Sequence, residues 1–173
     1  MKLLEYIQGD ESVKFRIVSL PPFKAASSGV DKNFDFSEEG ILGKFDAYFS
    51  DIKPLPRDDF MPRDFLFFDP VEQGMVWWWA LNEDMDSGNN DVVDFDGGYY
   101  LTYTYRDGDE EMGSKLYNEA IEYVNKSELF ELDERHNHYS MGHIITPQDI
   151  IKAQGWAQME TFIPIKLRTE HDR

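Results

Sequence analysis

The closing stretch of the chain, Trp156 to Leu167, reads WAQMETFIPIKL and decides how the fold is interpreted. Its run of aromatic and β-branched residues predicts a strand. Side chains alternate between the two faces of a strand, so Glu160 shares a face with Phe162 and Pro164. A carboxylate on an apolar face is costly to bury unless it is paired, protonated or poised for a ligand. Two interpretations stay open: this face is exposed to solvent, or Glu160 is a buried acid that accepts a cation or acts as a general acid or base.

The stretches before it alternate between strands and helices. In the second half, 99–105 is rich in β-prone tyrosines and 110–125 carries an apolar stripe at helical spacing. The first half has a strand pattern over 12–19, with Val13, Phe15 and Ile17 on one face, and a helical pattern over 41–52 that Ser37 caps. Further strands are expected over 23–29, 64–68, 75–81, 129–132, 139–145 and 156–167, and a short helix from Thr146-Pro147.

This order of elements repeats as β-α-β-β, without evident sequence identity between the halves. We therefore expect an α+β fold with two pseudo-symmetric modules, at about residues 10–85 and 92–167, within a single domain over 1–173. The antiparallel sheets of the two modules would flank a central ligand cleft. The most loop-like stretches are 51–63, which holds three prolines, and 82–91, which is rich in Asp, Asn and Gly.

The composition narrows the classes of function. Of 173 residues, 34 are acidic and 17 basic, and the net charge of −17 argues against a nucleic-acid-binding surface. The chain has no cysteine, which excludes disulfides, thiolate catalysis and cysteine-ligated zinc. No apolar run is long enough for a signal peptide or a membrane span, so we expect a cytoplasmic protein, monomeric or homodimeric, without membrane contact or cofactor. Aromatic residues, at 15%, are abundant for so acidic a chain.

The aromatic residues supply candidates for ligand binding. Trp77, Trp78 and Trp79 are consecutive, and alternation places Trp77 and Trp79 on one strand face and Trp78 on the other. Tryptophan ring faces bind planar apolar compounds and organic cations. Alternatively, one face of this strand packs on a helix and the other meets solvent or a partner. The remaining ring candidates are Tyr103, Tyr105, Tyr139 and Phe162.

Two patterns suggest a metal without meeting its requirements. His136, His138 and His143 lie close in sequence, but no acidic residue has a diagnostic spacing to them. The acidic segment 84–91 resembles a calcium loop, yet Phe95 stands where the twelfth position requires a glutamate. We therefore predict no metal site.

Three segments carry a resemblance to a known family. Glu160-Thr161-Phe162-Ile163-Pro164-Ile165 resembles the Glu-x-x-Ile-Pro signature that ends GyrI-like domains, the effector-binding domains of multidrug-responsive AraC-type and MerR-type transcription regulators. Gly97-Gly98-Tyr99-Tyr100-Leu101, an acidic turn and the helix over 110–125 resemble that family's strand, turn and helix. The segment over 18–26 resembles its opening strand. The resemblance spans about residues 10–167.

The resemblance implies two pseudo-symmetric modules with a ligand cavity between them. It implies that Glu160 occupies the family's central acidic position and faces aromatic walls, one of them on the strand of Trp77, Trp78 and Trp79. Family members bind bulky aromatic or cationic compounds, and some act through protein partners such as gyrase. A stand-alone subset resembles cyclopropanoid hydrolases, which open the strained ring of DNA-alkylating natural products. The segment before residue 10 is too short for a helix-turn-helix, so we expect a stand-alone form that does not bind DNA directly.

These observations leave three hypotheses. The first is a stand-alone protein that binds a bulky, planar aromatic compound, apolar or cationic, stacked on Trp77 or Trp79 with Glu160 as counter-charge. The second is a hydrolase of cyclopropanoid DNA-alkylating compounds, in which Glu160 is the catalytic acid or base. The third is an acidic inhibitor that mimics DNA toward an enzyme such as gyrase; its alternative is that the acidity only keeps the protein soluble.

Overall fold

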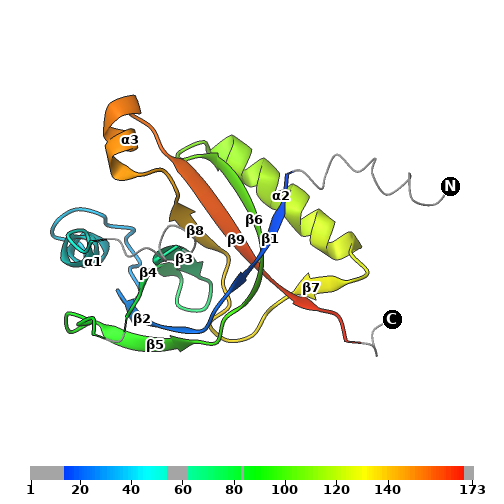
Figure 1. The fold of residues 1–173 in the computed structure, drawn as a ribbon, viewed down its shortest axis with the longest axis horizontal. Helices are drawn as coiled ribbons and strands as arrows, with labels where there is room; N and C mark the ends of the chain where they lie inside the picture. Colours follow the sequence, from blue (N-terminus) through cyan, green and yellow to red (C-terminus); the bar gives the residue numbers. More distant parts are fainter. Residues whose placement is uncertain (1–13, 54–61, 83, 170–173) are drawn as a thin grey trace.

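The strands form one continuous antiparallel sheet in the computed structural model (Figure 1). The structure describes residues 14–53, 62–82 and 84–169. Its nine strands lie in the order β1-β6-β9-β8-β3-β4-β2-β5, with β7 paired to β9. They are β1 (Arg16–Leu20), β2 (Phe23–Ser27), β3 (Asp64–Asp69), β4 (Gly74–Ala80), β5 (Asp91–Phe95), β6 (Gly98–Arg106), β7 (Phe130–Leu132), β8 (Met141–Ile144) and β9 (Gln158–Leu167).

The sheet is strongly curled. β5 lies at one end of the strand order and β6 near the other, yet the ring centroids of Phe95 on β5 and Tyr100 on β6 are 6.3 Å apart. Both rings belong to one core that also takes Leu20, Phe65 and Trp78 from other strands. A sheet brings its ends together only by bending around a shared core, so the face that carries these residues is concave. We call it the inner face and the opposite one the outer face.

Helices cover the outer face. α2 packs on β6 and β9 through Ala120 and Val124, and Asp109 caps it by accepting a hydrogen bond from a backbone N–H of its first turn. α1 lies over β4, where Phe45 and Phe49 meet the outer side chains of that strand. No helix in the described part is long and apolar enough to cross a membrane. The helices are α1 (Ile41–Phe49), α2 (Glu110–Lys126) and α3 (Gln148–Gln154).

The closing strand β9 has a central place in the sheet. It pairs with β6 along most of its length, and on its other side with β8 and β7. The register sets Glu160 opposite Thr104 of β6 and opposite His143 of β8. Directly paired residues point to the same face, so these three side chains form a row across the inner face. The expected strand over 156–167 is therefore confirmed, from residue 158 onward.

Several expected boundaries are corrected. α1 begins after Gly40, which offers no side-chain cap, so Ser37 is not its N-cap; the helix ends at Phe49 and not at Ile52. The segment assigned as a loop over 82–91 is followed at once by a strand that was missed, β5. The acidic residues beside Val92 and Val93 obscure the apolar pattern of this segment. It forms a strand because its backbone pairs with β2 along its whole length. Much of the loop-like stretch over 51–63 lies outside the described residues.

The two antiparallel sheets expected from the sequence form one continuous sheet. β1 belongs to the first half of the chain but pairs with β6 of the second half. β5, which follows the first half, pairs with β2 of that half. These two exchanges join the halves through backbone hydrogen bonds. An α+β fold with antiparallel strands is confirmed, whereas the pseudo-symmetry of the modules and their bounds at 10–85 and 92–167 stay predictions.

Candidate functional site

Glu160 lies on the inner face, with 4% of its surface exposed. Thr104 and His143 flank it on the neighbouring strands, and Phe162 is the next inner residue along β9. Oε1 of Glu160 accepts a hydrogen bond from Nη2 of Arg16 at 2.6 Å, and the Arg16 side chain is 68% exposed. The interpretation of Glu160 as a solvent-facing residue is therefore wrong. It is a buried acid whose counter-charge remains largely in water.

Arg16 reaches this acid from β1, at the edge of the sheet. Of the side chains predicted as the apolar side of this strand, Phe15 packs under α2, but Ile17 is 49% exposed. Val18 and Leu20 instead pack into the inner core. Arg16 shares their parity, so its side chain starts on the inner face. Arg16 was not a candidate from the sequence, because only the pairing of β1 with β6 shows that its side chain starts on the same face as Glu160.

A hydrogen-bonded pair, Asp64 and His143, lies next to Glu160 on the sheet. His143 is on the inner face with Glu160, whereas Asp64 starts on the outer face, because it is paired with Trp79. Oδ1 of Asp64, at the start of β3, is 3.0 Å from Nδ1 of His143. Oδ2 of Asp64 accepts a hydrogen bond from Nε1 of Trp77 at 3.1 Å. Both side chains are partly exposed, 24% for Asp64 and 17% for His143. From the sequence, His143 was a candidate only as a metal ligand, and Asp64 was not a candidate. Only the tertiary structure brings residues 64 and 143 together.

Two hydroxyls on the inner face lack a hydrogen-bond partner among the described residues: Oγ1 of Thr102 and Oη of Tyr100. Both residues are almost fully buried, and Thr102 is paired with Arg16 on β1. Burial raises the pKa of Tyr100, so its hydroxyl keeps its proton. Buried polar groups usually find partners, so the hydroxyl of Thr102 offers unused hydrogen-bonding capacity beside Arg16. Tyr100 lies farther along the sheet, opposite Pro164 of β9.

The three consecutive tryptophans divide between the faces as alternation predicts. Trp78 points into the inner core, where 2% of it is exposed and its ring meets Phe67 edge-on at 4.8 Å. Trp77 and Trp79 lie on the outer face under α1, and Trp79 stacks on Phe49 at 5.1 Å. The register from β9 through β8 and β3 to β4 places Trp78 on the face of Glu160. Trp77 and Trp79 are thus separated from Glu160 by the sheet.

The other ring candidates also fall on both faces. Tyr103 and Tyr105 lie on the outer face, next to α2. Burial raises the pKa of Tyr103 to about 12, against the opposing effect of its hydrogen bond with Thr161. Tyr139 packs against the inner core by stacking on Phe67, with ring centroids 4.4 Å apart. Of the predicted site residues, the structure therefore brings together Glu160, Phe162, Trp78 and Tyr139 on one face.

Comparison with known proteins supports the fold. Neither a protein-family model nor a curated protein sequence matches the chain. The structure of SAV2435 bound to tetraphenylphosphonium is similar with a TM-score of 0.55 and 11% identity, over 88% of this chain and 94% of that one. The EcmrR C-terminal domain matches with a TM-score of 0.55 and 10% identity, over 88% and 97%. A hydrolase from Listeria innocua matches with a TM-score of 0.52 and 10% identity, over 95% and 97%.

The chain has the GyrI-like fold. At 10–11% identity these likenesses establish the arrangement of the chain and not its ligand.

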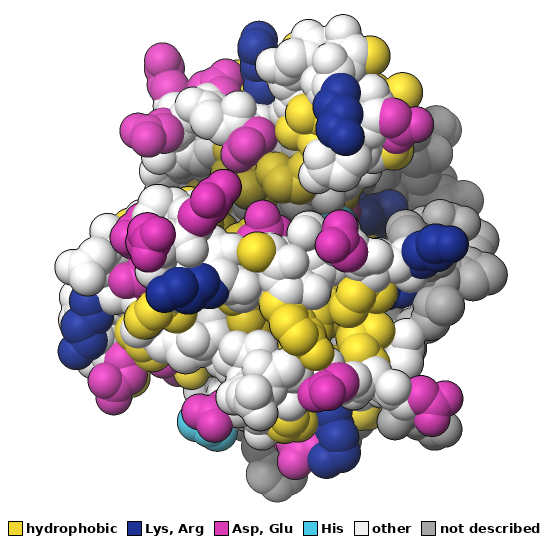
Figure 2. Space-filling model, turned by 90° about the vertical axis from the view of Figure 1, so that its left-hand side faces the viewer, with side chains coloured by type: hydrophobic (Ala, Val, Ile, Leu, Met, Phe, Trp, Pro, Cys, Tyr) yellow, Lys and Arg dark blue, Asp and Glu magenta, His cyan; other side chains and the backbone are white. Residues whose placement is uncertain are grey.

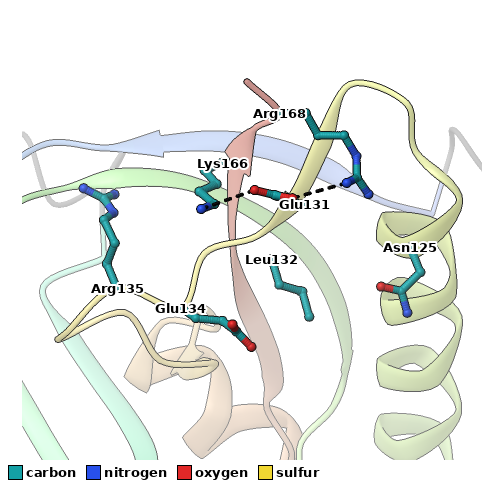
Figure 3. A pocket seen from close by; sticks show the side chains of 7 residues that line it. All are labelled: Asn125, Glu131, Leu132, Glu134, Arg135, Lys166 and Arg168. Carbon is teal, nitrogen blue, oxygen red and sulfur yellow. Dashed lines mark hydrogen bonds and ion pairs between the residues drawn. The ribbon is translucent and has the colours of Figure 1, made fainter. Parts of the chain in front are cut away.

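A separate pocket lies on the GyrI-like sheet beside the end of α2 (Figure 3). It has a volume of about 550 Å³. Glu131 bridges two cations in it, with its carboxylate oxygens 3.2 Å from Lys166 and 3.2 Å from Arg168. Arg135, at the pocket wall, donates to both oxygens of the buried Asp133. The three cations of this pocket are thus each paired with a carboxylate. Its lining residues are Asn125, Glu131, Leu132, Glu134, Arg135, Lys166 and Arg168.

The histidines among the described residues have separate environments. In the buried His138, Nδ1 is 2.9 Å from a carbonyl of the same loop and Nε2 is 2.9 Å from the carbonyl of Gly97, while His136 is exposed. Within the described residues, no three His, Asp or Glu side chains gather so that they could hold a metal ion.

The surface over α1 and α3 is mixed in character. Figure 2 shows hydrophobic side chains reaching this surface between Asp and Glu side chains. Elsewhere on the exposed surface, Phe34 and Phe68 stack on one another with ring centroids 6.2 Å apart, and both are more than one third exposed. These rings belong to the outer side of the molecule and not to the inner face that holds Glu160.

Proposed function

We propose that this protein binds bulky aromatic cations on the inner face, with Glu160 as the counter-charge. The observation that carries the proposal is the contrast within one ion pair: the side chain of Glu160 is 5% exposed and that of Arg16 is 68% exposed. A buried carboxylate needs a cation, since an unpaired charge in the interior is strongly unfavourable. Arg16 meets that need from the solvent side, where another cation can take its place.

The exchange of Arg16 for a ligand cation has a favourable electrostatic balance. Arg16 returns to water with little change in its own hydration, because most of its side chain is already exposed. The carboxylate of Glu160 keeps a positive partner throughout. An organic cation with a diffuse charge is weakly hydrated, so it loses less on leaving water than an ammonium group does.

The surroundings of Glu160 suit an aromatic compound. Phe162 and Phe65 belong to the same face and meet edge-on, with ring centroids 5.8 Å apart. The unpartnered hydroxyl of Thr102 lies near Arg16 on the neighbouring strand. A protein with the same fold, SAV2435, has been solved with tetraphenylphosphonium bound, a bulky aromatic cation. Trp77 and Trp79 are not part of the proposed site, since they lie on the outer face.

Titration with tetraphenylphosphonium tests the proposal. Calorimetry measures the dissociation constant of the native protein and of Glu160→Gln, which keeps the shape of the side chain and removes its charge. We expect the variant to bind the cation about tenfold more weakly or worse. Glu131→Gln is the matched control, because Glu131 is an ion-paired glutamate away from Glu160, in the pocket beside α2.

The control also distinguishes the inner face from the pocket beside α2. An unchanged affinity in Glu160→Gln, or a loss confined to Glu131→Gln, would place the cation elsewhere and overturn the proposal. A second candidate function is hydrolysis, because the hydrogen-bonded pair of Asp64 and His143 lies beside Glu160.

A further inference from the structure

We propose that His143 is the general base of a hydrolytic activity at this site, and that Asp64 is its positioning residue. The substrate class is an aromatic cation that carries an activated ester. The inference rests on the proposed cation site, because Glu160 would hold the charged part of the substrate. It adds a reaction, which binding alone does not require.

The contacts of Asp64 determine which nitrogen of His143 can act. An ionised carboxylate only accepts hydrogen bonds, so Nδ1 of His143, 3.0 Å from Oδ1, carries the proton. With that proton on Nδ1, Nε2 is the nitrogen left to act as the base, and it has no hydrogen-bond partner among the described residues. Asp64 is itself held in place, because Trp77 donates to its other oxygen. An imidazole fixed by a carboxylate in this way is the arrangement by which histidine accepts a proton from water or a hydroxyl.

The position of His143 relative to Glu160 gives the two residues different tasks. They are directly opposed on β8 and β9, and side chains in such pairs start about 4.5–5.5 Å apart at Cβ. Glu160 is engaged by a guanidinium and serves as an electrostatic anchor. His143 is a proton acceptor one strand away. A cation held at Glu160 therefore places the rest of the same molecule next to His143.

The proposed step is a general-base hydrolysis. The oxygen of a water molecule forms a bond to the acyl carbon, while a proton of that water passes to Nε2 of His143. The carbonyl electrons move onto oxygen and return as the bond to the alcohol oxygen breaks, and the leaving group departs with that electron pair. The products are a carboxylic acid and an alcohol or phenol. His143 then passes the proton to the departing oxygen, directly or through solvent.

The test uses the 4-nitrophenyl ester of (4-carboxybutyl)triphenylphosphonium, a probe that joins an aromatic cation to an activated ester. Release of nitrophenolate measures turnover. We expect His143→Ala to lower kcat about 100-fold or more and added imidazole to restore part of it. Asp64→Asn should lower kcat with little change in KM, because it alters the orientation of the base and not the binding of the cation. The matched control is His136→Ala, which removes an exposed histidine.

Binding of tetraphenylphosphonium is measured on the same variants, so that the two proposals can fail separately. The catalytic inference is overturned, and the binding proposal stands, if the native protein and His143→Ala bind this cation equally and either hydrolyse the ester at the same rate or both fail to hydrolyse it. If the native protein does not bind the cation, the binding proposal falls and the inference with it. Unchanged binding, together with a loss of turnover that imidazole restores, supports the inference. A purely structural role of His143 would not produce this combination.

Discussion

Nη2 of Arg16 lies 2.6 Å from Oε1 of Glu160, although 144 positions separate the two residues in the chain. The pair joins the edge strand β1 to the central strand β9 across β6. Because Glu160 is buried and Arg16 is largely exposed, Arg16 is the cation that the proposed ligand would displace.

The first prediction concerns this internal competitor. Arg16→Gln should bind tetraphenylphosphonium about tenfold more tightly than the native protein, because the ligand no longer has to displace a guanidinium. Calorimetric dissociation constants measure the effect. Lys24→Gln is the control, since Lys24 is equally exposed and forms an ion pair with Asp94 away from Glu160. Equal or weaker binding in Arg16→Gln would mean that Arg16 does not occupy the ligand position.

The same substitution should also lower the free energy of unfolding without ligand. It leaves the carboxylate of Glu160 buried and unpaired, a situation that costs up to about 3–5 kcal/mol when the lost partner is buried as well. Arg16 is 68% exposed, so we expect a loss of free energy at or below the lower end of that range. Urea denaturation measures it, and saturating tetraphenylphosphonium should recover more stability in the variant than in the native protein.

A second prediction concerns the buried hydroxyl of Thr102. Replacing a buried hydroxyl that lacks a partner with a methyl group of the same shape removes its desolvation cost. Thr102→Val should therefore leave the free energy of unfolding unchanged or raise it by about 1 kcal/mol. Urea denaturation provides the measurement, with Thr104→Val at an exposed position of the same strand as control. A clear loss of stability would show that Oγ1 has a partner in solution.

A third prediction concerns acid stability. Burial by itself would raise the pKa of Asp133, but hydrogen bonds from the side chain and backbone of Arg135 and the charges of His138 and Arg135 bring it below its usual value of 3.8. A carboxyl whose pKa is lowered by folding stabilises the protein above the pKa of the unfolded chain, and this contribution is lost as the pH falls through the folded value. Unfolding free energies at about pH 7 and about pH 3 should therefore differ more for the native protein than for Asp133→Asn. Equal pH dependence of the two would contradict the argument.

A fourth prediction tests the assignment of faces on β4. Trp78→Ala should lower the free energy of unfolding by about 3–5 kcal/mol, because it leaves a cavity in the inner core. Val92→Ala, at a half-exposed position on β5, is the control and should change it by about 0.5 kcal/mol or less. Thermal or urea denaturation distinguishes the two. Similar small losses in both variants would show that Trp78 does not lie in the core.

Local pattern identified most of the elements. The helix over 110–125 and the strands over 64–68 and 75–81 correspond closely to α2, β3 and β4, because hydrophobic periodicity and propensity act within a few residues. The sequence pattern did not predict β5, because its composition is polar and it is its backbone pairing with β2 that makes it a strand. Phe15 and Ile17 do share one face of β1, as alternation predicts, but Ile17 stays 49% exposed because β1 is an edge strand.

The sequence by itself determined that Glu160 is unusual: a carboxylate in a run of β-prone residues, on the face of Phe162. It also determined that Trp78 lies opposite Trp77 and Trp79, since alternation is a property of the strand alone. Only the tertiary structure decided which of those faces Glu160 shares, because that depends on the register of four strands across the sheet. The partners of the site, Arg16, His143 and Asp64, likewise come from distant segments, and long-range strand pairing is what brings their charges within reach of one another.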